Sequence, residues 1–195
     1  MPETTMIFME EKFENPQAYD LFVEIKQGRL DDVQVIEQYG AAGVGTDDLQ
    51  RKQRVIGRTE LFSRLDLRSQ RLLAFAAQWY TASPGERIFS IDDKADAAYL
   101  CVSGQAMLTI QTDDGYEQDI SVVDPGRLIG DLAVFMDETR QLNLTATSDV
   151  TFLRIGADEF RAVIENDPTV LMSLLQTVAG HLAGAAELLM QARVP

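Results

Sequence analysis

The sequence is poor in the side chains that bind metals and carry out nucleophilic catalysis. Its 195 residues include one cysteine, Cys101, and one histidine, His181. Because a disulfide needs two cysteines, none forms within the chain, and we expect a reducing, cytoplasmic environment. Zinc sites with several His or Cys ligands, Ser-His-Asp triads and Cys-His pairs would all depend on these two residues. We therefore expect no metal site and no enzyme of these classes.

Positive charge is also scarce. Asp and Glu number 31 against 17 Lys and Arg, which leaves a formal net charge of −14. The resulting field opposes binding to the phosphate backbone of DNA. The amino terminus lacks the basic start and apolar core of a signal peptide, and no run approaches the ~20 apolar residues of a membrane-spanning helix. The composition therefore excludes DNA as a bulk partner and predicts no membrane span.

The remaining composition, with 46% hydrophobic and 25% charged residues, is that of a globular domain with an extension. In the acidic amino-terminal part we expect one helix that begins at Pro16 and a second over residues 31–39. The glycine-rich residues 40–45 are expected to form a flexible link. We therefore divide the chain into a helical amino-terminal extension, residues 1–57, and a domain over residues 58–190.

Residues 51–71 reverse the overall charge, because they contain 7 basic and 2 acidic residues. Their apolar positions have a helical period, and a basic amphipathic helix is typical of surfaces that bind membranes or RNA. We favour the alternative that acidic neighbours in the same molecule neutralise these bases. Asp66 is expected to cap a further helix that runs towards Gln78.

From Trp79 to Ile155 the apolar pattern changes to that of short strands. Turn signals at Pro84-Gly85, Asp114-Gly115 and Pro125-Gly126 separate them. Many short strands with frequent turns predict an antiparallel sandwich or barrel. The fold class we expect is mainly β with flanking helices (α+β), an eight-stranded antiparallel β-roll or jelly roll over about residues 79–156.

Two carboxy-terminal helices are expected over residues 157–192. The first spans Ala157 to Glu165, and Pro168 begins a long second one. Apolar residues of this last helix repeat at spacings of four and three, which favours pairing with another apolar face and so a homodimer: Leu171, Leu175, Val178, Leu182, Ala185 and Leu189. Because this helix accounts for the residues after Asp167, we expect no DNA-binding domain on the chain.

The segment from Gly130 to Asn143 carries the strongest functional signal. It begins as one turn of helix, whose free backbone N–H groups and dipole favour an anion, and Arg140 follows. A guanidinium can give a phosphate two parallel hydrogen bonds, so the pattern predicts binding of a small phosphate ester, with Arg140 as the main positive charge. In the alternative interpretation, Asp131 only caps the turn and Arg140 forms a surface ion pair with Asp137 or Glu138.

These motifs, in this order, resemble the cyclic nucleotide-binding domain family over about residues 58–190. The resemblance rests on the Gly-Asp-Leu-Ala turn with Arg140 ten residues after its glycine, and on four further segments: Phe62-Ser63-Arg64-Leu65, Pro84-Gly85-Glu86-Arg87-Ile88-Phe89, Tyr99-Leu100-Cys101-Val102-Ser103-Gly104 and Asp124-Pro125-Gly126. It implies that this segment is a phosphate-binding cassette, in which Asp131 bonds the ribose, Arg140 holds the cyclic phosphate, and the amides of Gln141 and Leu142 complete the contact. The implied ligand-binding residues are Gly130, Asp131, Leu132, Arg140, Gln141, Leu142 and Asn143.

The cassette departs from the family pattern at several positions. Asp131 stands where Glu is usual and Thr139 where Pro is usual. Gln141 and Leu142 are bulkier than the small residues that let the backbone approach the phosphate. Asn143 can hydrogen-bond a purine, but the segment does not select adenine over guanine.

The function we expect is that of a non-catalytic regulatory sensor. It would bind cAMP or cGMP, need no other cofactor, and signal through its carboxy-terminal helix. The alternative is a degenerate domain that acts as a structural or dimerisation module of a larger assembly. A metal enzyme of the cupin type shares a β-roll, but it needs several histidine ligands and is excluded by the single histidine.

Overall fold

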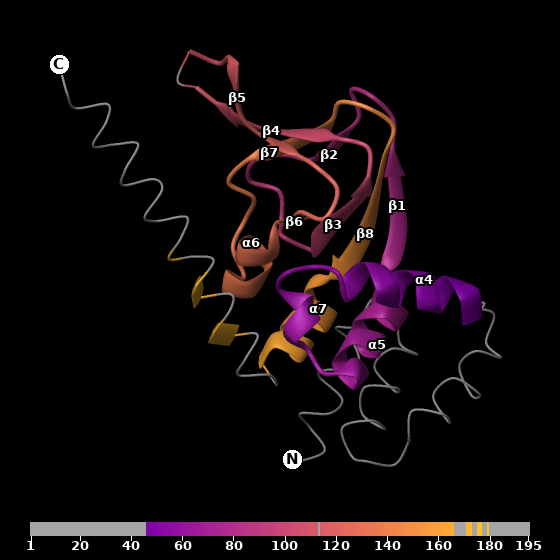
Figure 1. The fold of residues 1–195 in the computed structure, drawn as a ribbon. Helices are drawn as coiled ribbons and strands as arrows, with labels where there is room; N and C mark the ends of the chain where they lie inside the picture. The colour runs from indigo at the N-terminus through magenta and orange to yellow at the C-terminus, as the bar shows by residue number, and fades with distance from the viewer. Residues whose placement is uncertain (1–45, 113, 166–170, 173–174, 177–178, 180–195) are drawn as a thin grey trace.

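The computed structural model describes residues 46–112, 114–165, 171–172, 175–176 and 179 (Figure 1). The helices expected before residue 46 and the glycine-rich link lie outside this set. Most of the expected final helix, with His181, also lies outside it, and its roles in signalling and in a homodimer stay predictions. The pieces at 171–172, 175–176 and 179 are helical. No helix in the described ranges has the length and apolar character needed to cross a membrane.

Eight antiparallel strands form two sheets of four, which confirms the expected β-roll. One sheet has the order β1-β8-β3-β6, and its strands are β1 (Gln78–Ala82), β8 (Val150–Gly156), β3 (Ala97–Ser103) and β6 (Leu128–Ile129). The other has the order β2-β7-β4-β5, and its strands are β2 (Arg87–Phe89), β7 (Asn143–Ala146), β4 (Ala106–Gln111) and β5 (Glu117–Val123).

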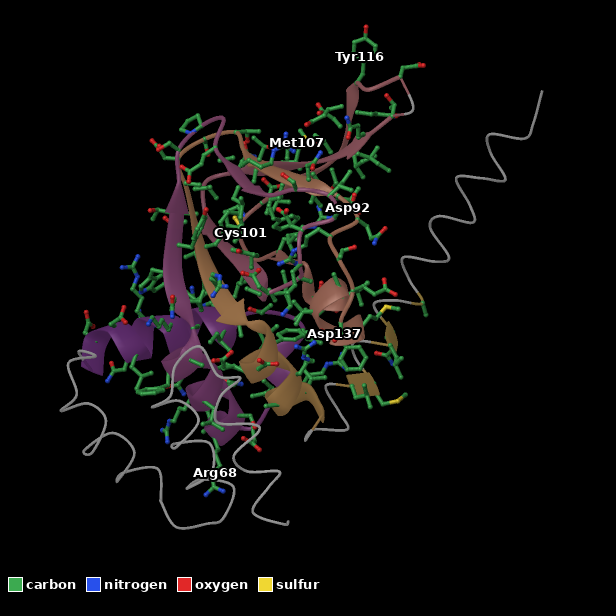
Figure 2. The ribbon with its side chains drawn as sticks, turned by 180° about the vertical axis from the view of Figure 1, so that it is seen from behind. Arg68, Asp92, Cys101, Met107, Tyr116 and Asp137 are labelled. Carbon is green, nitrogen blue, oxygen red and sulfur yellow. The ribbon has the colours of Figure 1, made fainter. Side chains whose placement is uncertain are left out.

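Aromatic and aliphatic side chains fill the interior of the roll. The ring of Tyr99 meets that of Phe152 edge to face at 5.9 Å and lies 5.8 Å from that of Phe89, a separation at which aromatic pairs attract. Leu144 and Cys101 pack in the same cluster, and both are at most 1% exposed. Cys101 is therefore a core residue, and Figure 2 shows it inside the roll.

Five helical elements complete the described part: α4 (Thr46–Ile56), η1 (Phe62–Arg64), α5 (Leu67–Ala76), α6 (Asp131–Met136) and α7 (Ala157–Glu165). Figure 1 shows α4, α5 and α7 gathered at one end of the roll, while the β4–β5 hairpin projects from the other end. Phe62 and Phe160 meet edge to face at 6.0 Å in the apolar cluster that joins these helices to the roll. Asp66 caps α5 as expected, because its carboxylate accepts a 2.7 Å hydrogen bond from the amide of Ser69.

Helix α4 is fixed to the start of β1 by one tryptophan. The indole nitrogen of Trp79 donates a 2.6 Å hydrogen bond to Asp48, and the guanidinium of Arg51 lies 4.8 Å from the centre of the ring. Asp48 also pairs with Lys52 at 3.1 Å, so part of the basic segment is neutralised within the molecule, as we expected. Ile56 is fully buried in the cluster shared with α5 and α7. Helix α4 thus packs on the domain, and the division of the chain at residue 57 stays a prediction.

Candidate functional site

A cavity of about 890 Å³ opens at α6, and most of the residues expected to bind ligand line it. Its lining includes six of them: Gly130, Asp131, Leu132, Arg140, Gln141 and Leu142. Other parts of the wall come from the segment between α4 and α5, from strands of the β2-β7-β4-β5 sheet, from β6 with the turn before it, and from Gln176. A volume of this size is within the usual range for small-molecule sites.

The backbone at Gly130 makes room for the side chain of Arg140. Gly130 has a φ of +78°, in the left-handed region that favours glycine, and a Cβ built on it would overlap with Nη1 of Arg140. Gly130 is also the N-cap of α6 and makes no side-chain capping bond, while Asp131 is the first helical residue. The N-cap position of this turn is therefore occupied by Gly130 and not by Asp131.

Arg140 is turned into the protein and is only 2% exposed. Its Nη2 donates a 2.6 Å hydrogen bond to the carbonyl of Ala97 and lies 3.4 Å from a carboxylate oxygen of Asp96. Its Nη1 donates to the carbonyl of Gly130 at 3.4 Å, and the guanidinium carbon lies 4.4 Å from the centre of the Phe89 ring. The alternative of a surface ion pair with nearby acids of the cassette is therefore wrong, because the acidic partner of Arg140 is Asp96, on another segment.

Another donor of this guanidinium, the Nε–H group, is unpaired. Nε of Arg140 is buried and has no hydrogen-bond partner among the described residues. Burial lowers the pKa of Arg140, while the nearby Tyr99 hydroxyl and Asp96 carboxylate oppose this effect. An arginine side chain nevertheless stays charged in proteins. The cavity wall therefore holds a fixed cation whose Nε–H is unsatisfied.

Asp96 links this cation to the neighbouring sheet. Its second carboxylate oxygen accepts a 2.8 Å hydrogen bond from Nη2 of Arg154, on β8. Its carbonyl accepts from the amide of Ala157, where α7 begins. The sequence contained no signal for this role, because Asp96 lies 44 residues before Arg140 and the sheet register alone brings the two together.

The residues after Arg140 run along the edge of the cavity. The backbone of Arg140 is hydrogen-bonded on both sides to residues 92 and 93, which fixes the segment in place. Gln141 is exposed and Leu142 is half-buried, and both line the cavity. Asn143 is not among the lining residues, since it is buried and its side-chain oxygen accepts a 2.9 Å hydrogen bond from the amide of Ile91.

Further arginines contribute to the lining, so the expectation that Arg140 supplies most of the positive charge is corrected. Arg64 of η1 and Arg127 of the turn before β6 both line the cavity. Nη1 of Arg127 donates to Ser121 Oγ at 2.6 Å and to the carbonyl of Val122 at 2.7 Å. The local charge of the cavity wall is thus opposite to the net charge of the chain.

The end of α6 is attached to α7 by one arginine. Nη1 of Arg161 donates to the carbonyl of Val134 at 3.1 Å and to Asp137 at 2.7 Å, and its Nη2 donates to Asp158 at 2.9 Å. Asp137 has a positive φ of 56° and ends the helix. Figure 2 shows it beside α6. Among the described residues, no three His, Cys, Asp or Glu side chains gather as a potential metal site.

The roll is similar in sequence to known proteins. Residues 81–167 match the family model described as the cyclic nucleotide-binding domain. Lysophospholipase nte1 of Aspergillus oryzae is 26% identical over 130 residues, which is 67% of this chain and 8% of that protein. A CRP-like cAMP-activated global transcriptional regulator of Mycobacterium tuberculosis is 24% identical over 98 residues, which is 50% of this chain and 44% of that protein. The aligned region thus spans less than half the length of either relative.

Solved structures share the same fold. The Catabolite Activator Protein of Thermus thermophilus superposes with a TM-score of 0.62 at 26% identity, over 68% of this chain and 62% of that one. The sensor domain of the transcriptional regulator DNR from Pseudomonas aeruginosa has a TM-score of 0.65 at 17% identity, over 71% of this chain and 93% of that one.

Proposed function

Since residues 81–167 belong to the cyclic nucleotide-binding domain family, we propose that this chain is a regulatory module that binds a cyclic nucleotide and catalyses no reaction itself. The observation that carries the proposal is that Arg140, a residue of the cavity wall, has a buried Nε without a hydrogen-bond partner. A buried donor without an acceptor costs about 1–3 kcal/mol. A phosphate oxygen would supply the missing acceptor.

The Nη1 and Nη2 nitrogens of Arg140 are held in fixed positions, as a binding site requires. Two backbone carbonyls and Asp96 fix the guanidinium, so little rotamer freedom remains to be lost when a ligand binds. A charge-assisted hydrogen bond to a phosphate contributes roughly 1.5–3 kcal/mol where water is excluded. Arg140 thus recognises the phosphate by local geometry, in a chain whose net charge of −14 repels anions at long range.

The neighbouring cassette residues are proposed to bind the sugar and the rest of the phosphate. The carboxylate of Asp131 lies at the start of α6 in the cavity wall and is proposed to accept a hydrogen bond from the ribose hydroxyl. The amides of Gln141 and Leu142 are proposed to contact the phosphate. Asn143 supports the segment from behind through its bond to Ile91.

Two contacts connect the ligand cavity and its cassette to the carboxy-terminal helices. Arg161 ties the end of α6 to α7, and Gln176, in a described piece of the final helix, lines the cavity. We propose that a ligand bound at the cassette changes what both helices contact. We propose that this is how the domain signals, and that the final helix is also the seam of a homodimer.

Titration calorimetry tests the proposal. Wild-type protein should bind cAMP, cGMP or both, and Arg140→Ala should weaken binding at least tenfold. Arg87→Ala is the matched control, because it removes an arginine that pairs with Glu117 outside the cavity lining. Thermal unfolding of each variant shows whether the fold is retained. No heat from wild-type protein with any cyclic nucleotide at millimolar concentration would reject the sensor function.

A second candidate, a structural module with a degenerate cassette, has its own support. Gln141 and Leu142 add bulk to the cavity edge, and Ala97 and Asp96 already engage Nη2 of Arg140. A thermal shift series across nucleotides, run with sedimentation analysis, separates the two. A dimer whose unfolding temperature no nucleotide raises would favour the structural module.

A further inference from the structure

We propose that Asp93 and Asn143 are positioning residues, which raise the affinity for the nucleotide without touching it. Both side chains hold the turn over residues 90–93, which we call the clamp turn, and the backbone of this turn holds the backbone of Arg140. This inference rests on the proposed function, because it concerns how the arginine that receives the phosphate is kept in place. Neither Asp93 nor Asn143 is among the residues that line the cavity.

Two backbone hydrogen bonds join the clamp turn to Arg140. The amide of Asp92 donates to the carbonyl of Arg140, and the amide of Arg140 donates to the carbonyl of Asp93, both at 2.9 Å. Lys94 and Thr139, the next residues on each side, form an antiparallel bridge. These contacts fix the backbone from which the buried guanidinium extends. The position of that cation therefore depends on where the clamp turn lies.

The carboxylate of Asp93 closes the clamp turn. It accepts a 2.7 Å hydrogen bond from the amide of Ser90, and the amide of Asp93 donates to the carbonyl of Ser90 at 3.2 Å. Between these two residues, Asp92 has a positive φ of 69°, which is uncommon for a residue other than glycine. A backbone in this region persists where neighbouring contacts determine it. Without the carboxylate of Asp93, we expect the turn to relax and its carbonyl to leave the amide of Arg140.

Asn143 attaches the same turn to the β2-β7-β4-β5 sheet. Its Oδ1 accepts a 2.9 Å hydrogen bond from the amide of Ile91, and the residue is only 7% exposed. Asn143 is the first residue of β7 and pairs with Thr109 of β4, so the sheet fixes its backbone. The side chain that we expected to contact the ligand is therefore bonded to the clamp turn instead.

The two side chains raise affinity by keeping Arg140 in place before the ligand arrives. A molecule in which the clamp turn has moved has to restore it before the phosphate binds. The apparent affinity therefore falls with the fraction of molecules that hold Arg140 in position. The loss of one hydrogen bond changes such an equilibrium by roughly 2- to 13-fold. We expect about three- to tenfold weaker binding when either side chain loses its acceptor.

Titration calorimetry with cAMP and cGMP tests the expected loss of affinity. Asp93→Ala and Asn143→Ala remove the acceptors, so each should weaken binding about three- to tenfold. Asp93→Asn keeps an acceptor in the same place and should bind as wild type does. Asp119→Ala is the matched control, because it removes an exposed carboxylate on β5 outside the cavity lining. Thermal unfolding shows whether each variant retains the fold.

A double-mutant cycle shows whether Asp93 acts through Arg140. Arg140→Lys keeps a cation but lacks the planar donor group that has to be oriented. If Asp93 acts by positioning Arg140, Asp93→Ala should weaken binding by less than about twofold in the Arg140→Lys background. A residue with only a general effect on the fold would give the same loss in both backgrounds.

The Nε–H signal of Arg140 in a proton–nitrogen correlation spectrum gives a readout in the free protein. Arg140→Lys identifies this signal, because it is the side-chain signal that disappears. It should shift or broaden in Asp93→Ala and in Asn143→Ala, whose clamp turns have lost a contact. It should stay in place in Asp93→Asn and in the control Asp119→Ala.

The outcomes separate this inference from the proposed function. Wild-type affinity in both alanine variants, an equal loss in Asp93→Asn and Asp93→Ala, an equal loss in both backgrounds of the cycle, or an unmoved Arg140 signal would overturn the inference and leave the proposed function intact. If wild-type protein binds no cyclic nucleotide, the proposed function fails, and the claim about affinity fails with it. The Arg140 signal does not depend on that result and still shows whether the two residues hold the guanidinium.

Discussion

Gly130 packs so closely against the guanidinium of Arg140 that there is no room for a Cβ atom at position 130. The Cβ of any other residue at position 130 would overlap with Nη1 of Arg140, whose bond to the Gly130 carbonyl holds the guanidinium in the cavity wall. The ten-residue spacing of the cassette therefore has a steric cause as well as a chemical one.

Gly130→Ala should lower both stability and affinity. The positive φ disfavours alanine, and the overlap forces Arg140 out of its position, so we expect a loss of about 1–3 kcal/mol in the free energy of unfolding. Nucleotide affinity should fall at least tenfold. Urea unfolding and titration calorimetry measure the two effects.

Gly85→Ala is the matched control for this substitution. Gly85 has a φ of +84°, but a Cβ there meets no atom within 4 Å. It carries the backbone strain without the overlap, so its stability loss should be smaller and its affinity unchanged. Equal effects at the two glycines would contradict the steric role of Gly130.

Arg161→Ala should loosen the attachment of α6 to α7. The substitution removes bonds to Asp137, Asp158 and the carbonyl of Val134, and we expect it to cost about 1–2 kcal/mol. Asp137→Asn should cost less than 1 kcal/mol, because asparagine tolerates the positive φ and the carboxylate is largely exposed. Urea unfolding measures both, with the exposed Arg58→Ala as the reference. A larger loss in Asp137→Asn than in Arg161→Ala would contradict this assignment.

The fluorescence of Trp79 should report the protonation of Asp48. Burial alone would raise the pKa of Asp48, but hydrogen bonds from Trp79 and Lys52 outweigh it and lower the pKa. A carboxylate with a lowered pKa stabilises the folded state above its unfolded pKa, and this contribution is lost as the pH falls through the folded value. Since Trp79 is the only tryptophan, we expect a fluorescence change in acid, with a midpoint below the ordinary pKa of an Asp side chain.

Asp48→Asn is the control for that titration. It keeps a hydrogen-bond acceptor for the indole but has no charge to lose, so the transition should disappear. A transition that persists in the variant, or a wild-type midpoint above the usual Asp range, would show that another group is responsible.

Cys101 should be unreactive in the folded protein. Burial raises the pKa of its thiol to about 11, and the side chain is 1% exposed. At pH 8 about one thiol in a thousand is then ionised, and only the thiolate reacts. We expect reaction with a disulfide reagent to be at least a hundredfold slower than in denaturant. Rapid labelling of native protein would show that the roll opens readily at β3.

Local pattern was enough to predict most elements of the domain. The turn residues separated the strands of the roll, Asp66 began α5, and Ala157 to Glu165 matches α7. Helix α5 ends at Ala76, earlier than expected, because Gln78 already pairs with Arg154 in the sheet. Apolar periodicity and capping depend on neighbours in sequence, which is why they can be interpreted without a structure.

The sequence predicted only those parts of the site that depend on residues adjacent in the chain. The helical turn and the position of Arg140 follow from adjacent residues, whereas its bonds to Asp96 and Ala97 depend on how distant strands align. Arg127 drew no attention in the sequence because a turn arginine is ordinarily solvated. Only the fold shows that this residue lies in the same cavity wall as Arg140.

The strand order of the first sheet has a consequence for biosynthesis. In the order β1-β8-β3-β6, the last strand made, β8, lies between β1 and β3 and pairs with both. During synthesis, β1 has to wait without its partner until residues 150–156 have left the ribosome. Pairing over such a separation is slow and leaves strand edges open to other chains. Shortening the chain before β8 would therefore remove the strand that holds this sheet together.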